Sequence, residues 1–133
     1  MKTYAVAYGG AIVTLLVLDA IWLGLMARSF YVPKLGHLMA EQPNFAIAAL
    51  FYLFYAVAVA ILASVPGFSQ ASLATALGFG AVLGFAAYGT YDFTNLATLK
   101  DWPVVVTVVD IIWGTVVTAA SAAGGYLALK WFA

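Results

Sequence analysis

Three aspartates lie inside long apolar stretches of the sequence, where a carboxylate is energetically costly. Asp19 stands in the run VLDAIW, Asp92 in GTYDFTN and Asp110 in VVDIIW. Acids placed in this way face a protein interior and commonly mark proton, ion or substrate sites. Three carboxyl groups near one another could share a proton, bind a cation or act as a general acid and base. These residues are therefore the first candidates for chemistry.

The composition indicates which solvent surrounds these acids. Of the 133 residues, 66% are hydrophobic and 8% are charged, with a mean hydropathy of +1.07. Soluble domains carry about 25% charged residues, so we predict an integral membrane protein whose partner is the lipid bilayer. Five basic and five acidic side chains cancel, which leaves no basic patch for a nucleic-acid partner. The absence of cysteine excludes disulfides and thiolate metal sites.

Four stretches are long and apolar enough to cross a bilayer, which takes about 20 residues each as helix. They cover about 4–27, 44–65, 71–97 and 103–131. Pro66 and Gly67 are expected to stop the second helix, and Ser69 or Ser72 to cap the third. Residues 28–43 read as an interfacial loop with aromatic anchors. We predict an all-α integral membrane protein, a four-transmembrane-helix bundle with short loops, forming a single domain over 1–133.

Counting along the helices places the three acids in one layer of the bilayer. Asp19 lies nine residues before the loop at 28, Asp92 eight before 100, and Asp110 seven after 103. These separations correspond to about 13, 12 and 10 Å at a rise of about 1.5 Å per residue. All three loop ends lie on one side of the membrane. The carboxyl groups are therefore expected to share a depth.

Helical spacing selects the side chains that accompany the acids. We predict a ligand- or cation-binding set with acids, hydrogen-bond donors and an amide, consisting of Asp19, Asp92, Asp110, Asn95, Tyr88, Tyr91, Trp22, Trp113 and Thr107. No lysine or arginine lies in the spans at this depth, so the three carboxylates cannot all stay ionised without compensation. A proton, a bound cation or penetrating water would supply it. No metal ligand set and no cofactor is predicted, and Tyr52 and Tyr55 are expected to pack or to line a wall.

Small residues on two helices indicate close helix packing. Glycines separated by three residues let transmembrane helices approach. The residues expected to serve this purpose are Gly80, Gly84, Gly89 and Gly114.

Several motifs together resemble a known family. They are LDAIWLG (18–24), RSFY (28–31), LGHL (35–38), YDFTNLATLKDWP (91–103) and VDIIWGT (109–115). The sequence is similar to a family of small four-span bacterial membrane proteins catalogued only as a domain of unknown function. The resemblance implies four helices and a bacterial inner-membrane location, and no activity. Its motif positions correspond to Asp19, Trp22, Asp92, Asn95, Trp102, Pro103, Asp110 and Trp113.

Three functions remain open from the sequence. The favoured hypothesis is an intramembrane acidic site for a proton, a cation or a small polar ligand, related to transport and formed in a homo-oligomer. The second is a membrane enzyme acting on a lipid-like substrate, against which no activated nucleophile or phosphate-binding loop is found. The third is an accessory or assembly subunit of a larger membrane complex. The count of basic residues favours cytoplasmic loops at 28–43 and 98–102.

Overall fold

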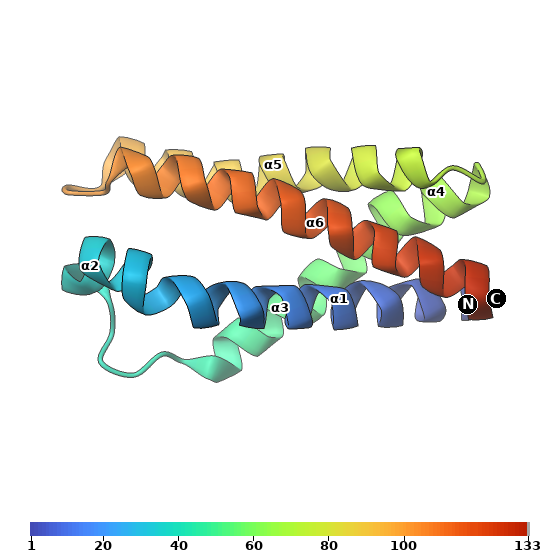
Figure 1. Cartoon of the computed structure of the whole chain (residues 1–133), viewed down its shortest axis with the longest axis horizontal. Helices are drawn as coiled ribbons and strands as arrows, with labels where there is room; N and C mark the ends of the chain where they lie inside the picture. The colour runs from blue at the N-terminus through green and yellow to red at the C-terminus, as the bar shows by residue number, and fades with distance from the viewer. Residues whose placement is uncertain (133) are drawn as a thin grey trace.

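The chain folds as four membrane-length helical segments. The computed structural model describes residues 1–132, and within this range it contains helices and no strand. The segments that are long and apolar enough to cross a membrane are Lys2–Leu38, Phe45–Ser69, Leu73–Thr98 and Val104–Phe132. Both termini lie at one end of the bundle, and the loops at 39–44 and 99–103 lie at the other end (Figure 1). The predicted four-helix membrane bundle is confirmed.

The first segment extends beyond its expected end. Helix α1 (Lys2–Met26) continues through a π-helical turn (Ala27–Tyr31) into α2 (Val32–Leu35) and a 3₁₀ turn (Gly36–Leu38). The connection predicted over 28–43 is therefore largely helical, and only 39–44 lie outside a helix. The helix survives Pro33 because the π turn, closed by the Val32 N–H on the Ala27 carbonyl, widens the backbone just before it. Pro33 then falls in the first turn of α2, where its missing N–H costs little.

The second segment repeats this arrangement at another Val-Pro pair. Helix α3 (Phe45–Val59) passes through a π turn (Ala60–Ser64) into α4 (Val65–Ser69), and the Val65 N–H bonds to the Ala60 carbonyl. Pro66 again lies in the first turn after the wide turn. The expectation that Pro66 stops the helix is therefore wrong, because the helix ends at Ser69.

The last two helices form a hairpin. Helix α5 (Leu73–Thr98) begins at Ser72, whose hydroxyl accepts a hydrogen bond from the Thr75 N–H at 3.1 Å, one of the two caps expected. The connection to α6 (Val104–Phe132) is short, and Asp101 within it adopts a left-handed φ of 62°. The backbone reverses at this residue and directs Trp102 back against the bundle, where it is 8% exposed.

Glycines bring α6 close to its neighbours. A Cβ added at Gly80 would lie 2.9 Å from the Ala119 Cα, and one at Gly84 would meet the Gly114 carbonyl. A Cβ at Gly114 would overlap the Tyr88 ring. These three glycines lie where α5 and α6 approach closely. Gly89 differs, because a Cβ there would meet only Phe93 of its own helix, at 3.5 Å.

Sequence reasoning did not identify a second glycine contact, between α1 and α6. There a Cβ at Gly10 would meet the Gly124 carbonyl, and one at Gly124 would meet the Thr14 hydroxyl. Small residues thus hold α6 between α1 and α5.

Helix α3 is the least enclosed part of the bundle. It packs on α1, whereas the contact of the second segment with α5 is made mainly by residues 60–69. Figure 1 shows α3 running obliquely to the other helices toward the loop end. Its outward side chains are apolar and face the bilayer, among them Phe45, Leu50, Phe54 and Val57. Helix α3 therefore diverges from α5 toward the loop end.

Candidate functional site

The three aspartates line one cavity. This cavity, of about 310 Å³, lies between the helices toward the loop end, and Asp19, Asp92 and Asp110 all form part of its wall. Aromatic side chains supply much of the remainder, including Trp22, Tyr31, Tyr52, Tyr88, Tyr91, Trp102 and Trp113. Helices α1, α5 and α6 each contribute one acid, so the shared depth expected from helical rise leads to a shared space.

Asp19 is held by two donors from other helices. One carboxylate oxygen accepts a hydrogen bond from the Tyr52 hydroxyl of α3, and the other accepts one from the Trp113 indole N–H at 3.0 Å. Asp19 is only 8% exposed. Buried carboxylates require such partners to offset the loss of water, and both oxygens of Asp19 have one.

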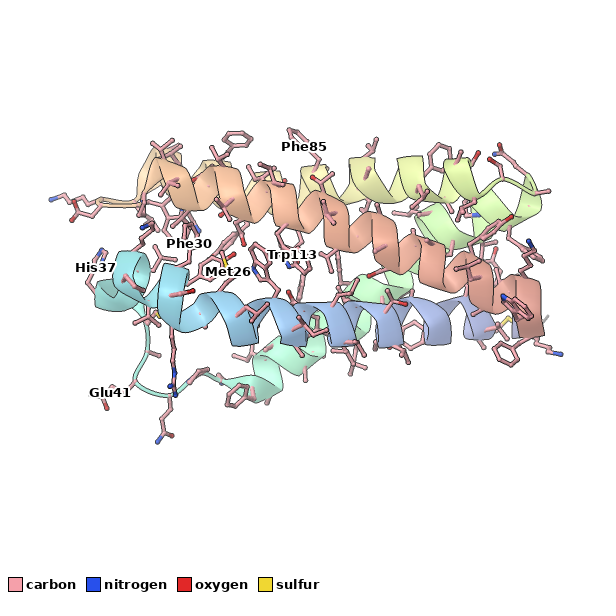
Figure 2. The ribbon with its side chains drawn as sticks, in the orientation of Figure 1. Met26, Phe30, His37, Glu41, Phe85 and Trp113 are labelled. Atoms are coloured by element: carbon pink, nitrogen blue, oxygen red, sulfur yellow. The ribbon has the colours of Figure 1, made fainter. Side chains whose placement is uncertain are left out.

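Asp110 is held through a relay from the first segment. The Tyr31 hydroxyl donates to an Asp110 oxygen at 2.8 Å and accepts from the Trp22 indole N–H at 3.0 Å. Trp22 stacks on Trp113 with ring centroids 4.4 Å apart and planes 5° from parallel. Figure 2 shows Trp113 projecting from α6 into the space beside α1. The stacked pair therefore connects the hydrogen bonds of Asp110 with those of Asp19.

Asp92 has no such support. It is fully buried, and neither of its carboxylate oxygens has a hydrogen-bond partner within residues 1–132. The cavity wall contributed by this described chain includes no lysine, arginine or histidine. An unpartnered buried carboxyl costs several kcal/mol when ionised and about 1–3 kcal/mol as an unsatisfied polar group. Asp92 is thus the group in the cavity that most needs a partner.

Of the other predicted site residues, four line the cavity and two do not. Tyr88, Tyr91, Trp22 and Trp113 line the cavity with the acids. Thr107 does not, because its hydroxyl accepts from the Trp102 indole at 3.1 Å and holds that ring in place. Asn95 is also outside the lining, and its carbonyl accepts the Leu99 N–H at the end of α5.

Two tyrosines were missed by sequence reasoning. Sequence reasoning assigns Tyr52 to packing or to a wall, without the hydrogen bond to Asp19, and it places Tyr31 in an interfacial loop. The inward positions of the first segment are 19, 22, 26, 31 and 35, and the step of five between 26 and 31 is the π turn. A regular helix would carry position 31 to a different face, since its inward steps are three and four. The feature of the sequence that could have indicated the π turn is the Val32-Pro33 pair that follows it.

Other titratable groups lie away from this cavity. His37 and Glu41 occupy the loop end, apart from Trp113 (Figure 2). In residues 1–132, no three carboxylate or histidine side chains are grouped so as to hold a metal ion. The acids instead surround a space larger than a single ion.

Comparison with family models relates this geometry to known proteins. The model described as "Predicted membrane protein (DUF2177)" matches residues 4–127. The chain belongs to this family. The matched range includes all three aspartates and every aromatic residue named in the cavity wall. No curated protein and no solved structure matches the chain.

The tyrosine relay in this DUF2177 protein can be tested by removing one hydroxyl. We expect Tyr31→Phe to destabilise the fold by about 1–3 kcal/mol, because the Trp22 N–H and an Asp110 oxygen lose their shared partner. Tyr4→Phe on the exposed face of α1 is the matched control and should change stability by under about 0.5 kcal/mol. Unfolding by sodium dodecyl sulfate in mixed micelles, followed by circular dichroism, measures both. Equal stability of the two variants would contradict the relay.

Proposed function

We propose that this membrane protein binds a cationic group in the aspartate cavity, with Asp92 as its principal counter-ion. The observation that carries the proposal is the state of Asp92, which is fully buried beside two other acids and has both oxygens unpartnered among the described residues. A cation in the cavity would supply the missing positive charge beside Asp92.

The surroundings favour an organic cation over a bare metal ion. A volume of about 310 Å³ is at the lower end of small-molecule pockets, which span about 300–1,000 Å³. Indole and phenol rings line the space, and their faces attract ammonium groups by about 0.5–2 kcal/mol. Asp19 and Asp110 are already stabilised by hydrogen bonds from neutral donors. We therefore assign the ligand to the class of substituted ammonium compounds, with a proton as the alternative occupant of Asp92.

The location and assembly of the protein form part of the same proposal. The bundle is placed in a bacterial inner membrane with residues 28–43 and 98–102 on the cytoplasmic side, which the count of basic residues (Arg28, Lys34 and Lys100 against Lys2 and Lys130) supports. We expect four helices to be too few to enclose a continuous path across the bilayer. A transport role would accordingly require a homo-oligomer or a partner subunit in a larger membrane complex.

Binding of tetramethylammonium to the full-length protein in phosphatidylcholine nanodiscs tests the proposal. Three of the four tryptophans line the cavity, so Trp131→Phe leaves a fluorescence signal from Trp22, Trp102 and Trp113. Asp92→Asn should weaken binding at least about tenfold, since two unit charges about 4 Å apart attract by about 4 kcal/mol at an effective dielectric constant of about 20. Asp101→Asn, in the exposed turn, is the matched control and should bind as the parent does.

Two outcomes would overturn this proposal. One is the absence of saturable tetramethylammonium binding to the parent protein. The other is an Asp92→Asn variant that binds as tightly as the parent. Uptake of labelled tetramethylammonium into proteoliposomes then distinguishes a transporter from a binding protein.

A further inference from the structure

A second hollow lies beside the aspartate cavity on the flank of the bundle. This groove, of about 340 Å³, is lined by Phe51 of α3, by Ala87, Tyr88 and Tyr91 of α5, and by Asp110 of α6. Tyr88, Tyr91 and Asp110 also line the aspartate cavity. The two spaces are therefore adjacent and share part of their walls.

The groove opens toward the bilayer and not toward an end of the bundle. Its rim residues Phe51 and Tyr91 are 50% and 55% exposed, and each projects from the flank of a membrane-spanning helix. The second segment contacts α5 mainly through residues 60–69, so α3 and α5 diverge where the groove lies. Phe51 stacks on Tyr55 at 5.2 Å, which fixes the α3 wall of the opening.

The two spaces differ in polarity. The groove wall is mainly apolar, and Asp110 contributes a carboxyl group to it. The cavity beyond contains the unpartnered Asp92 and the hydrogen-bonded Asp19. A molecule occupying both would need an apolar part toward the lipid and a positively charged part toward the acids.

We infer that the ligand is a single-chain amphiphilic cation that enters sideways from the bilayer, its hydrocarbon chain between α3 and α5 and its charged head against Asp92 and Asp110. This inference rests on the proposed function, because it specifies the substrate class of the same site. The volume suits one chain, since it lies near the lower limit of about 300 Å³ for ligand pockets. The charge of the head follows from three acids with no basic side chain in the described cavity wall.

A comparison of two cations with the same head isolates the groove. The probes are dodecyltrimethylammonium and tetramethylammonium, added to the full-length Trp131→Phe protein in phosphatidylcholine nanodiscs. Ala87→Trp fills the groove from α5 and should weaken binding of the dodecyl compound about tenfold, while tetramethylammonium changes less than about twofold. Ala86→Trp, one residue away on the exposed face of α5, is the matched control and should affect neither probe. Partitioning of the long chain into lipid is the same for both variants and cancels in the comparison.

A second pair of variants keeps the test decisive if Ala87→Trp does not fold. Phe51→Trp enlarges the α3 wall of the groove, and Phe54→Trp places the same ring on the lipid face of α3, where Phe54 is 69% exposed. The first should weaken binding of dodecyltrimethylammonium selectively, and the second should not.

The outcomes separate this inference from the proposed function. If Asp92→Asn abolishes binding of both cations but the groove variants bind both like the parent, lateral entry is wrong and the cation site stands. If Asp92→Asn leaves both cations bound, both proposals fail. If 1-dodecanol, a neutral amphiphile, quenches the tryptophans as strongly as the dodecyl cation, the assignment of a charged head is overturned.

Discussion

Replacing Asp92 with leucine is expected to stabilise the folded protein by about 1–3 kcal/mol while it removes cation binding. The reason is that Asp92 is fully buried, and no donor group of the described chain is hydrogen-bonded to its carboxylate oxygens, so its substitution removes a buried acid beside Asp110 and leaves no donor unpaired. The neighbouring cavity has room for the larger side chain. Unfolding by sodium dodecyl sulfate in mixed micelles gives the change in free energy.

Asp19→Leu is the comparison that makes this prediction specific. It places the same side chain in the same cavity but leaves the Tyr52 hydroxyl and the Trp113 N–H without an acceptor. Each unpaired donor costs about 1–3 kcal/mol, so Asp19→Leu should destabilise the fold. If Asp92→Leu were as destabilising as Asp19→Leu, Asp92 would have a structural partner and the argument for an external ligand would collapse.

Gly114→Ala is expected to destabilise the protein strongly, by about 3 kcal/mol or more, because the added methyl group would overlap the Tyr88 ring. Tyr88 is in turn packed against Tyr55, with ring centroids 6.4 Å apart, and forms part of the cavity wall. The ring therefore cannot move without disturbing the site. Loss of helical signal at a lower detergent fraction and weakened tetramethylammonium binding should appear together.

Gly78→Ala serves as the control for the glycine prediction. It introduces the same methyl group into α5 at a position with nothing within 4 Å. Alanine is favoured over glycine in a helix by up to about 1 kcal/mol, so this variant should be as stable as the parent or slightly more so. A Gly114→Ala protein that unfolds at the same point as Gly78→Ala would refute the close contact with Tyr88.

The features that sequence reasoning predicted depend on fixed helix geometry. The depth of Asp19, Asp92 and Asp110 could be counted because the rise per residue hardly varies. The inward direction of Trp113 and Tyr88 followed from the three-to-four-residue periodicity of a helix. The glycine contacts of Gly80, Gly84 and Gly114 also follow from regular spacing.

The features that were missed depend on departures from that geometry or on partner choice. Tyr31 reaches Asp110 because a π turn shifts the register of the first segment, and composition alone made that segment resemble a loop. Tyr52 bonds Asp19 because α3 crosses α1 obliquely, an angle that no periodicity specifies. Thr107 belongs to the predicted binding set, yet its hydroxyl accepts a hydrogen bond from the indole of Trp102 in the adjacent turn. Hydrogen-bond partners between helices are decided by packing, which a single sequence does not display.

The left-handed residue Asp101 limits how this turn can vary among related sequences. Asparagine or glycine would adopt the same φ without difficulty, whereas valine or isoleucine would be strained there. The adjoining indole of Trp102 forms part of the cavity wall, so strain at position 101 would alter the shape of the ligand's surroundings although residue 101 itself is exposed to solvent. The backbone conformation at position 101, and not the charge of its side chain, thus determines which residues can occupy it.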